Sequence, residues 1–161
     1  MAVGVARRGQ TGEMTGPMVL LDGDGESLRA AAGEYTVRLT GADTDGRLAV
    51  VEYLLPPYSV GAEEHVHHDH SEQFLVLSGE VVFRVAGDEV VAGPGSVLAV
   101  PEGVAHAFRN DGHEDALLVF LLTPAGYEEY FRDVDALLAR EGEADAEALA
   151  GLRQAYGTDT L

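Results

Sequence analysis

Short apolar segments separated by turn residues fill the central part of the chain. Glycine, proline, asparagine and aspartate mark the turns, as in Gly87-Asp88, Gly93-Pro94-Gly95 and Asn110-Asp111-Gly112. Many short strands with turns at even spacing are typical of an all-β sandwich or barrel. The pattern predicts strands at residues 18–21, 35–40, 47–55, 73–78, 80–86, 88–92, 96–100, 105–109 and 116–122.

Two of these strands are expected to form a hairpin, because residues 35–40 and 47–55 flank the Asp/Gly-rich turn Gly41–Gly46. A second hairpin is expected at Gly87-Asp88, where a glycine tolerates positive φ. The run Ala116–Leu122 is apolar throughout, which predicts a strand buried on both faces.

After Thr123-Pro124 the apolar positions change to helical spacing. The first predicted helix carries one apolar stripe, made of Tyr127, Phe131, Val134 and Leu138. The second is capped by Asp145, ended by Gly157, and carries Leu149, Leu152 and Tyr156 on one face. Neither helix can bury its stripe alone, so both should pack on the barrel. Packing is the simpler role for the first stripe, and a lid over the barrel mouth is the alternative.

The chain of 161 residues suits one domain with a sizeable core. We expect three parts: a flexible N-terminal tail at residues 1–17, a β-barrel at 18–123, and a helical extension at 124–161 packed on the barrel.

The amino-acid composition excludes several classes of partner and of catalytic chemistry. The net charge of −18 argues against nucleic acid or an anionic membrane as partner, because phosphates would be repelled. There is no cysteine for disulfides or thiolate catalysis, and no lysine for a Schiff base. Arg7-Arg8 is not followed by the apolar segment of an export signal, and no stretch is long enough to span a membrane. A cytoplasmic location is therefore expected.

A histidine-rich segment, His65–Glu72, holds the most informative residues. His65 and His67 are two apart, so on a strand they point to the same face. Glu72 opens the next strand on the face of Phe74. Two imidazoles and a carboxylate on one face are typical of a transition-metal site, and His106 is the candidate for a fourth ligand.

The other histidines fit a ligand role less well. His68 faces away from the predicted site, and His70 lies in a loop, so both are expected to be solvated. His113 lies in an Asp-Gly-His-Glu turn and is expected at the surface.

Two spaced motifs resemble those of the cupin superfamily. The first, His-x-His, four residues, Glu, six residues, Gly, matches His65 to Gly79. The second, Gly, five residues, Pro-x-Gly, two residues, His, three residues, Asn, matches Gly95 to Asn110. The first motif also expects a glycine six residues before its first histidine. Here that position is Ser59, and Gly61 lies nearby. Gly103 and Asn110 are expected to form turns.

The resemblance is greatest to small single-domain bacterial cupins of the quercetin 2,3-dioxygenase-like type. It implies an all-β fold, the cupin double-stranded β-helix or jelly-roll barrel, with C-terminal α-helices, usually as a homodimer. It also implies one divalent transition metal ion in the barrel mouth, held by His65, His67, Glu72 and His106. Iron, manganese, nickel, cobalt, copper and zinc all suit such ligands.

The implied reaction is a dioxygenase reaction on a small aromatic or enolic molecule. By resemblance, Glu72 would also serve as the base that takes a proton from a bound hydroxyl. Phe74, Phe108 and Phe120 are candidates for the pocket wall, although Phe108 fits plain core packing better. Tyr53 is a further candidate, but it alternates with Glu52 and only one of them can face inward.

Two other functions remain open on the same barrel. One is a non-redox metal enzyme, such as an isomerase, lyase or polyketide cyclase, in which the ion acts as a Lewis acid. The other is a non-catalytic protein that binds a small molecule.

Overall fold

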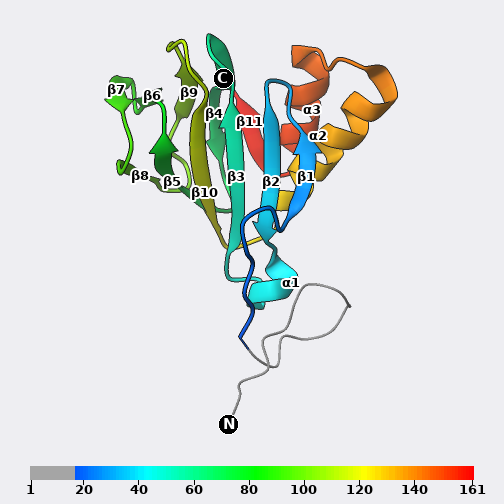
Figure 1. Cartoon of the computed structure of the whole chain (residues 1–161). Helices are drawn as coiled ribbons and strands as arrows, with labels where there is room; N and C mark the ends of the chain where they lie inside the picture. Colours follow the sequence, from blue (N-terminus) through cyan, green and yellow to red (C-terminus); the bar gives the residue numbers. More distant parts are fainter. Residues whose placement is uncertain (1–16) are drawn as a thin grey trace.

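Two antiparallel sheets form the body of the molecule in the computed structural model, which describes residues 17–161 (Figure 1). One sheet has six strands in the order β1-β2-β3-β10-β5-β8, and the other has five in the order β11-β4-β9-β6-β7. The strands are β1 (Glu26–Arg29), β2 (Glu34–Leu39), β3 (Ala49–Leu55), β4 (Ser59–His67), β5 (Ser71–Ser78), β6 (Val81–Val85), β7 (Asp88–Ala92), β8 (Val97–Val100), β9 (His106–Asn110), β10 (Ala116–Thr123) and β11 (Thr158–Thr160). The helices are α1 (Gly41–Thr44), α2 (Glu128–Glu141) and α3 (Ala146–Ala155).

The predicted all-β barrel with C-terminal helices is confirmed. β2 and β3 form the expected hairpin, with Val37 opposite Val51. β6 and β7 form the second hairpin, and its turn residues Ala86 and Gly87 both have positive φ, at 50° and 90°. Such a turn matches the right-handed twist of the flanking strands. The predicted strand at residues 18–21 is not formed, since only Met18 makes an isolated bridge.

The inner faces of the two sheets meet in one hydrophobic core. On β10 burial alternates, so that Leu118 and Phe120 are buried while Leu117 and Val119 are only partly covered. The prediction that this strand is buried on both faces is therefore wrong. Its apolar outer residues lie on the outer face of the six-stranded sheet, where the packing is less complete.

The C-terminal segment lies beside the barrel, with α2 against β1 and α3 against β11 (Figure 1). α2 buries an apolar face that includes Phe131 and Val134. Asp145 caps α3 as expected, its Oδ1 accepting the Ala148 N–H at 2.7 Å. α3 itself buries no residue.

After α3 the chain adds β11 to the five-stranded sheet, antiparallel to β4 and with Thr158 opposite His67. This strand was not predicted from the sequence, because its three polar residues carry no strand pattern of their own. None of the helices formed by residues 17–161 is long and apolar enough to cross a membrane. The predicted tail falls almost entirely outside the described residues.

Candidate metal centre

Four buried side chains meet between the two sheets. His65 and His67 come from β4 and His106 from β9 in the five-stranded sheet, while Glu72 comes from β5 in the six-stranded sheet. One nitrogen or oxygen atom of each lies within 4.8 Å of those of the other three. All four residues are at most 4% exposed. The structure thus brings together all four residues that the motifs predicted as metal ligands.

Strand register explains why these residues converge. His65 and His67 alternate with Val66 on β4 and therefore share a face. His106 lies directly opposite His65 in the β4–β9 ladder. The register of β4 shifts twice before His65, and such irregularities commonly re-aim side chains near functional sites.

Main-chain carbonyls orient two of the imidazoles. His65 Nδ1 lies 2.7 Å from the Glu63 carbonyl oxygen, and His106 Nδ1 lies 3.0 Å from that of Val104. A carbonyl can only accept, so in each neutral ring Nδ1 carries the proton and Nε2 keeps its lone pair. Both lone pairs therefore face the centre of the cluster, as a metal ligand requires.

The third imidazole is oriented by a side chain from the C-terminal strand. Thr158 Oγ1 donates to the Tyr156 carbonyl at 3.4 Å and lies 2.7 Å from His67 Nδ1. Because the hydroxyl proton points to Tyr156, the oxygen is placed to accept from His67 Nδ1–H. His67 Nε2 is then also free to bind an ion.

The spacing of the ligand atoms fits one shared ion. His65 Nε2 and His67 Nε2 are 3.2 Å apart, and the Nε2 atoms of His67 and His106 each lie 3.2 Å from Glu72 Oε2. Ligands bound to one ion at about 2.1 Å lie roughly 3.0–3.4 Å from each other. Two bare nitrogen lone pairs at such a distance repel each other unless a cation or a proton lies between them. The donor set and its spacing therefore fit a divalent transition ion.

The charges in the cluster also suit a cation. Burial alone would raise the pKa of Glu72. Hydrogen bonds from His106 and His67, whose Nε2 atoms carry a proton when no cation binds them, outweigh burial and hold the pKa of this carboxyl well below its usual range. Burial lowers the pKa of His106, yet the hydrogen bond with Glu72 leaves it above its ordinary value. Burial, reinforced by His106 and His67, lowers the pKa of His65 to about 3. Near neutral pH the carboxylate is ionised and His65 is neutral, the forms that bind metals.

A cavity of about 30 Å³ adjoins the cluster. Its wall is mainly aromatic and comes from both sheets and both C-terminal helices. The lining residues other than the cluster are Tyr35, Gly61, Ala62, Phe108, Phe120, Tyr127, Tyr130, Phe131 and Arg153. A space of this size holds about two water molecules, so larger ligands must displace side chains.

The four residues predicted for the pocket wall divide into two groups. Phe108 and Phe120 line the cavity. Phe74 is fully buried in the core, with its ring 6.0 Å from that of His106. Tyr53, and not Glu52, faces inward, but it is not part of the cavity wall, and its hydroxyl donates to the Ala32 carbonyl at 2.5 Å.

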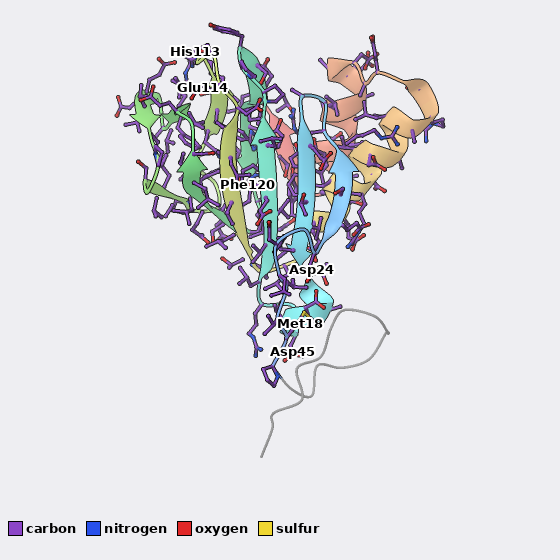
Figure 2. The ribbon with its side chains drawn as sticks, in the orientation of Figure 1. Met18, Asp24, Asp45, His113, Glu114 and Phe120 are labelled. Atoms are coloured by element: carbon purple, nitrogen blue, oxygen red, sulfur yellow. The ribbon has the colours of Figure 1, made fainter. Side chains whose placement is uncertain are left out.

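The remaining histidines differ from expectation at one position. His70 is 5% exposed and packs between His67 and Tyr127, with ring centroids 4.1 and 4.5 Å away. The prediction that His70 is solvated is therefore wrong, because Tyr127, just before α2, packs on its ring. His68 is exposed as expected, and His113 lies at the tip of the molecule, far from Phe120 (Figure 2).

The second motif also supplies a turn. Asn110 is 1% exposed, and its Nδ2 donates to the carbonyls of Leu55 and Glu114 while its Oδ1 accepts from Gly112 N. Gly103 has a φ of 77°. The expected turn-forming roles of both residues are confirmed.

Several residues of the site were not predicted from the sequence, among them Thr158, Tyr130, Arg153 and Tyr35. The first helical stripe was the signal that could have found part of this wall, since Tyr127 and Phe131 both line the cavity. That stripe serves two purposes: Val134 and Leu138 join the core, while the two aromatic residues cover the cluster.

Known proteins share this architecture and part of the sequence. A cupin domain model matches residues 51–122. The chain is 33% identical over 116 residues to quercetin 2,3-dioxygenase of Bacillus subtilis (strain 168), covering 72% of this chain and 34% of the relative. It is 35% identical over 81 residues to the tetracenomycin polyketide synthase protein TcmJ of Streptomyces glaucescens, covering 50% of this chain and 52% of the relative. The chain thus spans only about a third and about half of these two relatives.

A solved structure from Thermotoga maritima, described as a predicted oxalate decarboxylase, shares the fold. Its TM-score is 0.60 at 23% identity, and the match covers 66% of this chain and 99% of that one. Both cupin motifs lie on the strands where the ligands converge, and the domain match covers the core of the barrel. The chain is therefore a member of the cupin superfamily.

Proposed function

We propose that this protein is a metal-dependent enzyme that oxygenates a small enolic or aromatic molecule with dioxygen. The observation that carries the proposal is the buried cluster of His65, His67, Glu72 and His106 beside an aromatic cavity. The sequence similarity to a quercetin 2,3-dioxygenase supports the reaction class.

The four side chains would hold one divalent ion of iron, manganese, nickel, cobalt, copper or zinc. Such an ion supplies Lewis acidity, and a redox-active one also supplies electrons for dioxygen chemistry. The hydrogen bonds that the three Nδ1–H groups donate keep the imidazoles in one orientation and one tautomer. The aromatic wall excludes bulk water and gives a planar substrate apolar surface to pack against.

Glu72 would move the proton in this reaction. Its carboxylate is ionised and, among residues 17–161, is the only anionic group in the wall of the cavity. Its Oε2 now faces the Nε2 atoms of His67 and His106. In our proposal it accepts the hydroxyl proton of an enolic substrate, which makes the substrate oxygen anionic and easier to oxidise.

Cavity size limits how a substrate enters. The space of about 30 Å³ accommodates only about two water molecules, so an aromatic molecule fits only if side chains of the wall move. Tyr127, Tyr130 and Phe131 of the α2 segment form much of that cover.

Oxygen uptake by metal-loaded protein tests the proposal. Protein loaded separately with each of the six metals would be given flavonol, β-diketone and catechol substrates in an oxygen electrode. We expect substrate-dependent uptake with a redox-active metal, and its loss in Glu72→Gln and His106→Ala variants. Arg140→Gln, at an exposed position on α2, is the control and should keep full activity. Absence of uptake across every metal and substrate would refute the proposal.

The similarity to a polyketide synthase protein favours a second candidate, a non-redox metal enzyme. In that case turnover would persist with zinc under anaerobic conditions, because a Lewis acid needs no electron transfer. Tight recovery of an unchanged small molecule, without turnover, would instead indicate a binding protein.

A further inference from the structure

One cation lines the cavity beside the candidate metal ligands. Arg153, on α3, has a partly buried side chain and shares the cavity wall with His65, His67 and Glu72. Apart from the cluster itself, every other described residue of that wall is uncharged. The positive charge is therefore placed where a substrate would meet the ligands.

Among the described arginines, Arg153 differs in having no carboxylate partner. Of the eight arginines in residues 17–161, seven pair with a carboxylate at 3.7 Å or less. Within the described part of the chain, Arg153 makes no such ion pair. The protein has 28 acidic residues against 10 basic ones, so carboxylates are not in short supply. An arginine kept apart from them leaves its charge available to a ligand.

Neutral hydroxyls hold the Arg153 side chain in position. Its Nη1 donates to Thr160 Oγ1 of β11 at 3.3 Å, and the Tyr130 hydroxyl lies close enough for the arginine to influence its pKa. A guanidinium has five N–H donors in a planar fork, more than these two hydroxyls use. The remaining donors suit a carboxylate, which can take two parallel hydrogen bonds.

We propose that Arg153 binds an anionic oxygen group of the substrate, so that the protein acts on small organic anions, with a carboxylate as the simplest form. This rests on the proposed function, because the substrate must meet the metal ligands in the same cavity. The three imidazoles and one carboxylate leave a divalent ion with a charge of about +1, which adds to that of Arg153. Together they give an anion a local positive site inside a protein of net charge −18.

Formate and formamide are matched probes, being similar in shape and differing in charge. Both are small enough to enter with little displacement of the wall. Full-length protein loaded with cobalt(II) would be titrated with each by calorimetry and visible absorption, without dioxygen or turnover. We expect formate to bind more tightly than formamide, and Arg153→Gln to weaken formate binding about tenfold or more. Formamide binding should be unchanged by that substitution.

Two further variants make the result specific. Arg140→Gln removes the same charge from an exposed site on α2 and should leave formate binding unchanged. Arg153→Lys keeps the charge but loses the fork, so it should recover part of the affinity. Equal cobalt content and thermal midpoint would show that each variant is folded. If Arg153→Gln folds poorly, Arg153→Lys carries the test, and formate binding equal to wild type would then refute the proposal.

The outcome separates this inference from the dioxygenase proposal. Formate binding that is independent of Arg153, or formamide binding as tight as formate binding, would overturn the anion site whatever the oxygen uptake. Binding that depends on Arg153 in a protein that consumes no oxygen would leave the anion site standing and remove the dioxygenase.

Discussion

Replacing Thr158 with valine should weaken metal binding while leaving the metal-free fold almost intact. Valine keeps the shape and strand preference of threonine but cannot accept from His67 Nδ1–H, now 2.7 Å from the hydroxyl. Thr158 is 1% exposed and His67 3%, so water does not readily replace the lost partner. A buried N–H without an acceptor costs about 1–3 kcal/mol.

That cost falls mainly on the metal-bound state. Without metal, His67 can move its proton to Nε2 and donate to Glu72 Oε2, which lies 3.2 Å away. With metal, Nε2 must keep its lone pair, so the proton stays on the unpaired Nδ1. Since about 1.4 kcal/mol is a tenfold change, affinity should fall roughly 10- to 100-fold.

Competition with a chromophoric chelator measures the affinity directly, and urea unfolding of metal-free protein measures stability. Thr158→Ser keeps the hydroxyl and should restore most of the affinity. Thr36→Val on β2 makes the same chemical change outside the cluster and its cavity wall, and should have no effect on metal binding. An unchanged affinity in the Thr158→Val protein, or an equal fall in the Thr36→Val control, would refute the orientation of His67 by this hydroxyl.

Three further substitutions test the fold around the site. Phe74→Ala should lower the free energy of unfolding by about 3–5 kcal/mol, because the ring is fully buried; a loss under 1 kcal/mol by urea titration would contradict this. Asp145→Ala should cost about 1 kcal/mol through the lost α3 cap, and Asp145→Asn much less, as thermal unfolding would check. Gly61→Ala places a methyl carbon against the Phe108 ring with too little room, so it should displace that ring and cost about 1–3 kcal/mol; unchanged stability together with an unchanged ring position in a crystal structure would refute it.

The sequence predicted the metal ligands well because their relations are local or motif-based. His65, His67 and Glu72 lie within one strand–loop–strand segment, where side-chain alternation alone determines the shared face. His106 was reached through the spacing of the second motif, and its position opposite His65 follows from the β4–β9 ladder. Alternation likewise placed either Glu52 or Tyr53 inward, but only packing could choose between them.

The cover over the ligands could not be predicted in the same way. Thr158 is 91 positions from His67, and the two meet only because β11 pairs with β4. Arg153 reaches the cavity because α3 precedes that strand. His70 was misplaced for the same reason, since Tyr127 of a distant segment packs on its ring. Contacts of this kind depend on tertiary packing, which no local pattern in the sequence contains.

The division of the ligands between two sheets links metal uptake to folding. An unfolded chain offers the closely spaced histidines but not His106 beside them, so it should hold an ion far more weakly than the native barrel does. Each tenfold excess of free ion over the dissociation constant then adds about 1.4 kcal/mol to the stability of the native state. A bound ion would therefore hold β4, β5 and β9 together. In cells poor in that metal, the protein would be less stable towards unfolding.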